Sequence, residues 1–447
     1  MKETLIQVTQ LILCLSILVT LHELGHYWAA KYFKTRVDKF MLFFDPGFAI
    51  FKKKIGETTY GLGWLPLGGY VKIAGMIDES MDKDQLKQEP QPWEFRSKPA
   101  WQRLIIMIAG VVVNVLLAWL IYSALLVTNG DNYVSVDKMQ ENGLAFSEAM
   151  QQAGFEDGDK ILTVDGKHQP RADWMIIDIL LADQVIVDRN GKEVQININD
   201  SGVKSILNGA KNQGLFVPMI GDVVIDSLQP NGGAEKAGLQ VNDKIVKVNG
   251  VAFDNFNQFK KTLSTHRNDS IQLSVDRNGR EIQMAVLVSD SSSIGFYPKG
   301  LSEGQAQSMM VHDEYSVLAA IPAGLNKTFT NLTYQIKQFK LIIRPKTEAY
   351  KQVSGPLRLY KVFDGGWDWT RFWNFTAMFS IWLGFINILP IPALDGGHAM
   401  FTIIEMITGK KMSEKTMEIA QITGFVILMS LMALIFGNDI LHLIKGT

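Results

Sequence analysis

The stretch "LILCLSILVTLHELGHYWAAKYF" (residues 11–33) decides the organisation of this chain. An apolar run leads, without any turn signal, directly into His22, Glu23 and His26. Ionisable side chains inside a membrane helix are costly, and they are usually retained because they serve a function. We therefore expect a membrane-spanning helix that carries a functional site near its C-terminal end.

The remainder of the chain alternates between apolar and polar segments. Residues 4–32, 99–128, 371–394 and 417–436 are strongly apolar, and each run is close to the ~20 residues that cross hydrocarbon as a helix. Residues 130–310 are instead rich in Gly, Asp and Asn, as in water-soluble modules. The sequence thus predicts a polytopic α-helical membrane protein with four transmembrane helices, two inserted β-rich domains and a membrane-associated β-hairpin.

Charge and cysteine content exclude several classes of protein. The formal net charge of −1 argues against nucleic acid as a partner. Cys14 is the only cysteine, so no intramolecular disulfide can form. The first apolar run resembles a secretory signal, but its apolar character continues through "YWAA" (27–30) and no small-residue cleavage site precedes the charged motif. We interpret it as a retained membrane helix.

Lysine and arginine predict the orientation of the chain. Basic residues crowd two loops, one after the first apolar run and one before the last: Lys31, Lys34, Arg36, Lys39, Lys52, Lys53 and Lys54, and then Lys410, Lys411 and Lys415. With four spans these loops share one side, and the positive-inside rule assigns that side to the cytoplasm. Both termini and the polar insert are then extracytoplasmic, and the motif lies towards the cytoplasmic side.

These observations predict a sequence of segments. They are a first span (1–33), a cytoplasmic loop (34–98) with a β-hairpin at about 57–75, a second span (99–128), two β-rich domains (129–214 and 215–310), an amphipathic or interfacial helix with a linker (311–369), a third span (370–408), and a fourth span with the C-terminal tail (409–447).

The polar insert contains an internal repeat. "AGFEDGDKILTVDG" (153–166) aligns without gaps on "AGLQVNDKIVKVNG" (237–250), and "VDRNGKEVQI" (187–196) matches "VDRNGREIQM" (275–284). The pattern resembles circularly permuted PDZ domains of bacterial envelope proteases, which bind a peptide as an added strand. We expect "VPMIGDVV" (217–224) to be the peptide-binding strand of the second unit. The alternative is that both units are spacers whose grooves are unused.

The spacing of the first motif is typical of a metal site. His22 and His26 lie one turn apart on one helix face, so both imidazoles can bind one tetrahedral ion. Glu23 faces the same side without being needed as a ligand. This is the metallopeptidase arrangement, with two histidines on Zn²⁺ and Glu23 as the general base that takes a proton from water. The alternative is an interfacial histidine pair that reaches water without a metal.

A catalytic zinc site requires a third protein ligand. In "NILPIPALDGGH" (387–398), Asp395 follows an apolar helix that Pro390 and Pro392 interrupt. The first and third spans run in the same direction, and each polar motif lies at the C-terminal end of its span, so the two motifs reach a similar depth in the membrane. We favour Asp395 as the third ligand, with His398 as its rival.

A family resemblance is carried by "HELGH" (22–26) in the first span, "AGVVVN" (109–114) in the second and "NILPIPALDGGH" in the third, with two PDZ-like units between the second and third spans. The chain resembles the site-2 protease family of intramembrane zinc metalloproteases. The likeness is strongest to its bacterial branch of sigma-E regulators and covers essentially the whole chain. It implies one catalytic Zn²⁺ and location in a bacterial inner membrane. By the same resemblance His22, His26 and Asp395 match the zinc ligands, and Glu23 matches the base.

The resemblance also implies the reaction, which is cleavage of single-pass membrane proteins such as anti-sigma factors and remnant signal peptides. It assigns substrate binding to Asn387, and it matches Gly110 and Asn114 to a G-x-x-x-N element. Val111 departs from the family, in which a proline commonly follows that glycine, and this leaves the local helix shape open. The predicted substrate-binding residues are Asn387, Gly68, Gly69, Pro390 and Asn114.

Two further segments have alternative interpretations. "ETTYGLGWLPLGGYVKIAG" (57–75) predicts a membrane-re-entrant hairpin whose edge pairs with an unwound substrate, or else a cytoplasmic hairpin that caps the bundle. "YSVLAAIPAGLNKTFTNLTYQIKQFKLIIR" (315–344) is amphipathic and suits either a helix in the membrane interface or one that docks the PDZ-like units.

The sequence as a whole predicts a zinc-dependent intramembrane endopeptidase. Its expected partners are single-pass membrane substrates, the lipid bilayer and peptides bound by the PDZ-like units. A non-proteolytic membrane scaffold is one alternative, although the intact Glu23 and Asp395 argue against it. A metal transporter is a second alternative, but its pore would need more intramembrane carboxylates or histidines than the four spans supply.

Overall fold

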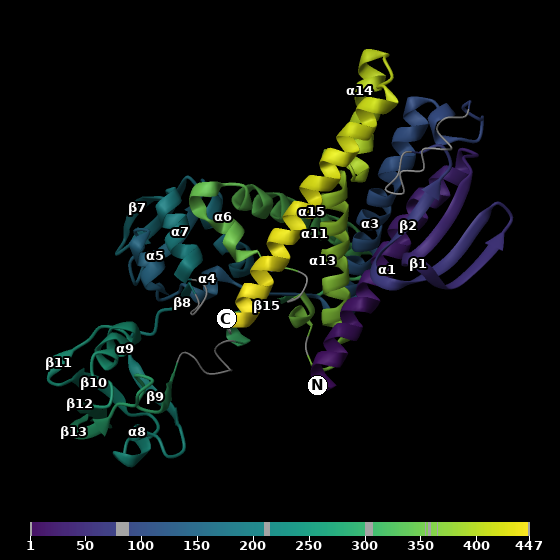
Figure 1. Ribbon diagram of the computed structural model, residues 1–447. Coiled ribbons are helices and arrows are strands. Elements are labelled where there is room, and N and C mark those ends of the chain that lie inside the picture. The colour runs from purple at the N-terminus through teal and green to yellow at the C-terminus, as the bar shows by residue number, and fades with distance from the viewer. Residues whose placement is uncertain are drawn as a thin grey trace. The chain divides into compact units, whose positions relative to one another are not determined.

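The computed structural model describes residues 2–76, 89–209, 215–299, 307–353, 355, 359–363 and 365–445. The chain forms two compact units (Figure 1). The first consists of Met1–Gly130, Glu314–Ile336 and Val353–Thr447, and the second consists of Asp131–Asp313 and Lys337–Gln352. Both chain termini therefore belong to the first unit, which also contains all the predicted membrane helices.

The first unit is built on long helices. They are α1 (Lys2–Tyr32), α3 (Ala100–Asn129), the first part of α11 (Val317–Ile342), α13 (Trp369–Ile388), α14 (Asp395–Thr408) and α15 (Glu414–Lys445), with short 3₁₀ turns η1 (Phe95–Ser97) and η4 (Tyr360–Val362). Among the described residues, three segments are long and apolar enough to cross a membrane: Lys2–Tyr32, Ala100–Asn129 and Lys415–Gly437.

The predicted third span differs from these three. It is not one helix over 370–408, because α13 ends at Ile388 and a separate helix, α14, begins at Asp395. Pro390 and Pro392 lie between the two helices, where each lacks the N–H that a continuing helix needs. In addition α13 contains Arg371 and several Trp, Asn and Thr residues, which lower its hydropathy below that of the other three segments.

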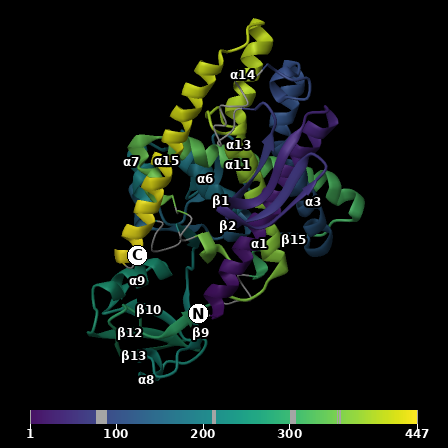
Figure 2. The same cartoon turned by 45° about the vertical axis from the view of Figure 1, so that its right-hand side comes forward.

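Helices α1, α3 and α13 pack side by side (Figure 2). Gly25 of α1 allows close approach, because a Cβ there would lie 2.6 Å from the carbonyl oxygen of Ala109 in α3. Cys14 lies fully buried in a cluster with Leu18 and Phe372. The hydroxyl of Thr376 in α13 lies 3.4 Å from the Cys14 sulfur, which links α1 to α13 at this level.

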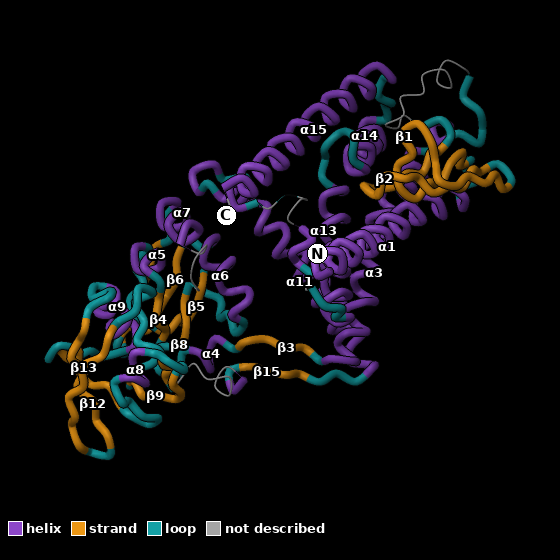
Figure 3. The backbone as a smooth tube through the Cα atoms, turned by 60° about the horizontal axis from the view of Figure 1, so that its bottom comes forward, coloured by secondary structure: helices purple, strands orange, loops and turns teal. Residues whose placement is uncertain are grey.

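A twisted sheet lies beside α1, formed by β1 (Val37–Ile55) and β2 (Thr58–Ile73) (Figure 3). Both strands double back, because Met41 of β1 lies opposite Gly61 and also opposite Tyr70 of β2. The structure therefore differs from the hairpin expected within 57–75: that segment is one bent strand, and residues 37–55, expected as a loop, are its partner. Residues 77–88 of the predicted loop lie outside the described residues.

The second unit contains two β-rich cores. The first core includes β4 (Leu144–Phe146), β5 (Lys160–Val164), β6 (Gln184–Arg189), β7 (Lys192–Asn197), β8 (Phe216–Pro218), α4 (Val136–Met139), α5 (Glu148–Gln152), α6 (Ala172–Leu181) and α7 (Asp200–Gly209). Strands β5, β6 and β7 form one sheet, and β4 pairs with β8. Strand β3 (Asp131–Val134) pairs with β15 (Met310–Asp313).

The second core is a sheet in the order β13 (Arg280–Leu287), β12 (Ser270–Arg277), β10 (Lys244–Val248), β9 (Val223–Leu228) and β14 (Phe296–Pro298), with β11 (Val251–Ala252) beside β10. It also contains α8 (Gly233–Lys236) and α9 (Phe256–Ser264). Its apolar side chains are separate from those of the first core.

Equivalent positions of the aligned stretches make the same contacts in the two cores. Asp159 accepts hydrogen bonds from Arg189 at 2.7 and 2.8 Å, and Asp243 accepts two from Arg277 at 2.7 Å. The hairpins β6–β7 and β12–β13 both turn through an Asn-Gly pair with positive φ. An Asp–Arg clasp therefore fixes each hairpin to the loop that precedes the strand paired with it, β5 in the first core and β10 in the second.

The strand expected to bind peptides is divided between the cores. Val217 and Pro218 lie in β8, which pairs with β4 of the first core. Val223 and Val224 begin β9, and β9 pairs on one side with β10 and on the other with β14. The structure thus places 215–218 with the first core rather than after the predicted boundary at 214–215. Residues 210–214 and 300–306, near the predicted edges, lie outside the described residues.

Helix α11 contributes to both units. In the first unit, Trp119 of α3 donates its indole N–H to the carbonyl oxygen of Ile321 at 2.8 Å. In the second unit, Lys337 pairs with Asp178 at 2.5 Å, and Leu341 joins the first β-rich core. The turns η2 (Pro345–Thr347) and η3 (Ala349–Gln352) follow. The end of this predicted amphipathic helix therefore docks on a β-rich core.

Candidate metal centre

The histidine pair lies where α1 packs closely against α3. His22 and His26 are each 5% exposed, and their Nε2 atoms lie 3.2 Å apart. Gly110 of α3 faces them: a Cβ at this position would lie 2.7 Å from Cε1 of His22 and would collide with Nε2 of His26. The absence of a side chain at residue 110 therefore makes room for both imidazole rings.

Asp395 reaches the same point from the break between α13 and α14. Ala393, two residues before it, has a φ of 84°, a left-handed conformation that is uncommon for residues other than glycine. A side chain on Gly396 would collide with the carbonyl oxygens of Ile388 and Leu389. The sequence "ALDGG" thus folds into a tight turn, and this turn presents Asp395 as the first residue of α14.

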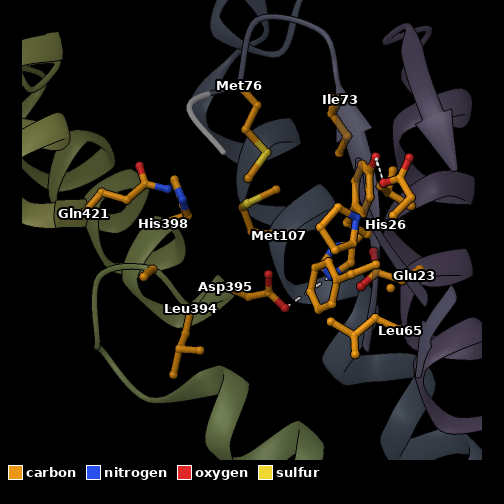
Figure 4. A pocket seen from close by; sticks show the side chains of 17 residues that line it. Glu23, His26, Leu65, Ile73, Met76, Met107, Leu394, Asp395, His398 and Gln421 are labelled. Carbon is orange, nitrogen blue, oxygen red and sulfur yellow. Dashed lines mark hydrogen bonds and ion pairs between the residues drawn. The ribbon is translucent and has the colours of Figure 1, made fainter. Parts of the chain in front are cut away.

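Three donor atoms form a nearly equilateral triangle. The Oδ2 atom of Asp395 lies 3.1 Å from Nε2 of His22. It lies 3.2 Å from Nε2 of His26 (Figure 4). Tetrahedral zinc with bonds of about 2.0–2.1 Å keeps its ligands about 3.3 Å apart. The three residues are therefore a group that could hold a metal ion, and their chemistry and spacing fit zinc.

Hydrogen bonds on the far side of the rings set the imidazole tautomers. Nδ1 of His26 lies 2.8 Å from the carbonyl oxygen of Ile106, so Nδ1 carries the proton and Nε2 keeps its lone pair. The amide of Asn114 lies 3.2 Å from Nδ1 of His22, and the Oδ1 atom of Asn114 has no hydrogen-bond partner in the present orientation.

Turning the Asn114 amide by 180° exchanges its oxygen and nitrogen, which have nearly the same shape. This gives the oxygen a hydrogen-bond partner and places an acceptor beside Nδ1 of His22. The oxygen then accepts the Nδ1–H of His22, and Nε2 of His22 is left with a lone pair towards Asp395. Asn114 is fully buried and lies one helical turn beyond Gly110. We therefore interpret Asn114 as the residue that orients His22.

The triangle opens onto a cavity of about 700 Å³. Seventeen described residues line it, among them Glu23, His26 and Asp395, with apolar residues of β2 and of the α13–α14 turn. Figure 4 shows Glu23 and His26 on one wall and Asp395 and Leu394 on the other. Glu23 and two of the three possible metal ligands therefore face one common space.

His398, the rival third ligand, lines the same cavity but is not part of the triangle. Figure 4 shows it near Gln421, away from His26. Asp395 begins α14, whereas His398 lies almost one turn further along that helix. The structure therefore brings Asp395, not His398, to the two imidazoles.

The predicted substrate-binding residues lie in different surroundings. Gly69 lines the cavity, whereas the backbone of Gly68 packs beside the ring of Phe44. Asn387 lies close to the triangle, with its amide nitrogen 3.2 Å from Nε2 of His22. Pro390 belongs to the turn before Asp395. Asn114 is placed behind His22, a role that its four-residue spacing from Gly110 could have suggested.

Two buried imidazoles and a partly exposed carboxylate, with a neighbouring glutamate, define the site of a single-metal peptidase. Residues 10–431 match the sequence profile of peptidase family M50, so the chain belongs to this family, the site-2 proteases. The chain is 28% identical to regulator of sigma-E protease RseP of Escherichia coli K12, over 96% of this chain and 97% of the relative.

Two putative zinc metalloproteases show the same extent of similarity. One from Vibrio cholerae is 28% identical over 97% of this chain and 98% of the relative. One from Neisseria meningitidis is 30% identical over 97% of this chain and 98% of the relative. The predicted family and the predicted zinc metalloprotease activity are confirmed.

Proposed function

We propose that this metalloprotease is an intramembrane endopeptidase that cleaves single-pass membrane proteins within or near their transmembrane segments. The observation that carries the proposal is the position of the three possible ligands: His22 and His26 are buried among apolar helices, and His26 and Asp395 line the wall of the cavity. A peptide bond that reaches them must come from a chain that is itself close to these helices.

A zinc ion held by His22, His26 and Asp395 would polarise the peptide carbonyl and acidify water, which supplies the nucleophile at neutral pH. Glu23 takes the proton from that water and returns it to the leaving amine. The carbonyl of Ile106 and the amide of Asn114 keep the two imidazoles in orientation. Asn387, beside His22, holds the substrate backbone.

The second half of β2 offers a place for an unwound substrate. Gly69, Val71 and Ile73 line the cavity, and this half pairs on one side with residues 37–44. Among the described strands none pairs with its other edge. An extended substrate segment can add to that edge as a strand. Gly68 and Pro390 then contribute through the backbone shape of the two loops that flank the cavity.

We further propose that α13 is a fourth span, because it packs along α3 and also contacts α1, and so needs less lipid-facing apolar surface. The chain would lie in a bacterial inner membrane, with the catalytic side towards the cytoplasm and two PDZ-like units outside. Those units would bind peptides or exclude untrimmed proteins. Anti-sigma factors and remnant signal peptides are the proposed substrates, as the family resemblance implies, and two relatives are named regulator of sigma E protease.

The test is the Glu23→Gln variant in reconstituted membranes, with a single-pass model protein as substrate. We expect cleavage to fall by a factor on the order of 10³ or more, because proton transfer is lost, while bound zinc stays at the wild-type level. Glu57→Gln, in the exposed turn between β1 and β2, is the matched control. Undiminished cleavage by Glu23→Gln would refute the mechanism.

A further inference from the structure

One carboxylate in the cavity wall has no part in the proposed chemistry. Asp45 lies where β1 turns back on itself, and it lines the same cavity as Glu23 and Asp395. Its Oδ1 atom accepts a hydrogen bond from the Tyr70 hydroxyl at 3.0 Å. Its Oδ2 atom lies 2.8 Å from the Nζ of Lys52.

The backbone around Asp45 is held firmly in place. Phe43 has a φ of 65°, and the ring of Phe44 stacks on that of Tyr70 with centroids 6.3 Å apart. Gly63 fits beneath this bend, since a Cβ there would collide with the backbone of Phe44. The position of the carboxylate therefore follows from the fold of the sheet and not from its ion pair alone.

The cavity lining carries acidic side chains without lysine or arginine to balance them. Its described lining contains three carboxylates, Glu23, Asp45 and Asp395, but neither lysine nor arginine. Glu23 and Asp395 serve the reaction and the metal. Asp45 is thus the one carboxylate of this lining that is left over, and a carboxylate shielded from water needs a cation.

The cation that Asp45 now holds can be replaced. The side chain of Asp45 is 13% exposed, whereas that of Lys52 is 45% exposed. Lysine is a flexible, strongly hydrated point charge, and an exposed lysine loses little when it returns to water. A second cation that arrives through the cavity can therefore take its place beside Asp45, and the Tyr70 hydrogen bond can remain.

We propose that Asp45 is a specificity-determining residue, which accepts a lysine or arginine side chain of the substrate close to the scissile bond. The inference rests on the proposed function, because it names a substrate feature for the same cavity. A cavity of about 700 Å³ is on the order of 10 Å across, and an extended chain that rises about 3.3 Å per residue crosses it in roughly three residues. The basic residue then lies within about three residues of the cut.

The experiment compares pairs of model single-pass substrates in reconstituted membranes. Each pair of substrates differs by Lys or Gln at one position, and the position is moved through three residues on either side of the cut. The measured quantity is the ratio of kcat/KM for the Lys substrate to that for the Gln substrate. A charged hydrogen bond predicts a ratio of about tenfold or more at one position for the wild type.

Three variants separate recognition from a structural role. Asp45→Asn should bring the ratio close to one, and Lys52→Gln should raise it, because the competing internal cation is gone. Asp38→Asn is the matched control, since Asp38 lies on the same strand, pairs with Arg36 at 2.8 Å and does not line the cavity; its ratio should stay at the wild-type value.

Two results would overturn the inference: no preference for Lys at any position in the wild type, or the same preference in Asp45→Asn as in the wild type. A loss that is equal for both substrates leaves the ratio unchanged and therefore also counts against it. Failure of the proposed function is a different outcome, in which the wild type cleaves neither substrate and equals Glu23→Gln.

Discussion

Asp395 of the first unit and Asp243 of the second are both largely shielded from water, but the cations that face them differ. Asp243 is 1% exposed and receives two hydrogen bonds of 2.7 Å from Arg277, whose charge is permanent. Asp395 faces His22 and His26, whose rings can be neutral and offer lone pairs. The guanidinium completes its site, whereas the imidazoles leave room for an ion.

The same contrast holds between the regions around them. In the β-rich unit the Asp–Arg clasp occurs at two equivalent places, Asp159–Arg189 and Asp243–Arg277, so it supports the fold. The triangle of His22, His26 and Asp395 is the one group of its kind that could hold a metal among the described residues. An aspartate shielded from water indicates function when its neighbours are histidines, which can be neutral and bind a metal, rather than a permanently charged arginine.

The strongest way to break this contrast is Asp395→Ala. Two imidazoles alone bind zinc weakly, so we expect bound zinc to fall from about one ion per chain to near zero after dialysis, with cleavage lost. His398→Ala is the control, because His398 lies outside the triangle, and it should keep its zinc. Zinc retained in Asp395→Ala and lost in His398→Ala would reverse the assignment.

Gly110→Ala tests the space that the imidazole rings need. The added methyl group would displace both rings, so zinc affinity should drop by about a hundredfold and the protein should lose about 1–3 kcal/mol of stability. Gly384→Ala is matched to it, since its Cβ would meet Asn114 at an ordinary 3.5 Å. Metal titration of both variants gives the answer, and equal affinities would contradict the crowding argument.

Asn114→Ala should have a smaller effect. Removing the acceptor for the Nδ1–H of His22 frees the ring to adopt the other tautomer, and zinc affinity should fall about 10–100-fold. Asn114→Asp keeps an acceptor oxygen and should retain most of the affinity. If Asn114→Ala and the wild type bound zinc equally well, the amide would not orient His22.

Asp243→Asn should leave the amount of bound zinc unchanged and destabilise only the β-rich core that contains it. Loss of a charge-assisted pair predicts about 2 kcal/mol less protection of the β12–β13 amides in hydrogen exchange. Asp290→Asn, in an exposed loop, is the control. A drop in zinc content for Asp243→Asn would show that the two regions do not differ in the way described.

The pH dependence of that effect has a definite sign. Burial alone would raise the pKa of Asp243, but Arg277 and the backbone N–H of Gln240 together hold it below its ordinary value. The stabilisation is therefore fully present above the unfolded pKa of about 3.9, and it disappears as the pH falls through the lower folded pKa. The wild type and Asp243→Asn should converge in protection only in that acidic range.

The sequence could predict those parts of the site that depend on local spacing. His22 and His26 are one turn apart on any helix, and prolines before Asp395 end any helix. Asn114 and Gly110 were harder to assign, because their role depends on how α3 lies against α1. The substrate role predicted for Asn114 came from a resemblance, whereas the contact with His22 came from packing.

The sheets were harder to predict for a related reason. Strand β8 has the pattern of a strand, but nothing in its residues shows that it pairs with β4, about seventy positions earlier. Strand β1 was expected as a loop, because Lys52 to Lys54 dominate its end, although "FMLFF" (40–44) is strongly β-forming. Strand β8 is decided by long-range pairing, which a single sequence does not display, whereas β1 pairs with the next strand across a two-residue turn and then bends back along it.

Cys14 of α1, buried against α13, has a practical consequence for measuring motion in this protein. A buried thiol reacts slowly with maleimides, and Cys14 is the only cysteine of the chain. Fluorophores or spin labels can therefore be attached to engineered cysteines while the native residue stays in place. The wild-type chain is already a suitable background for distance spectroscopy in the working membrane.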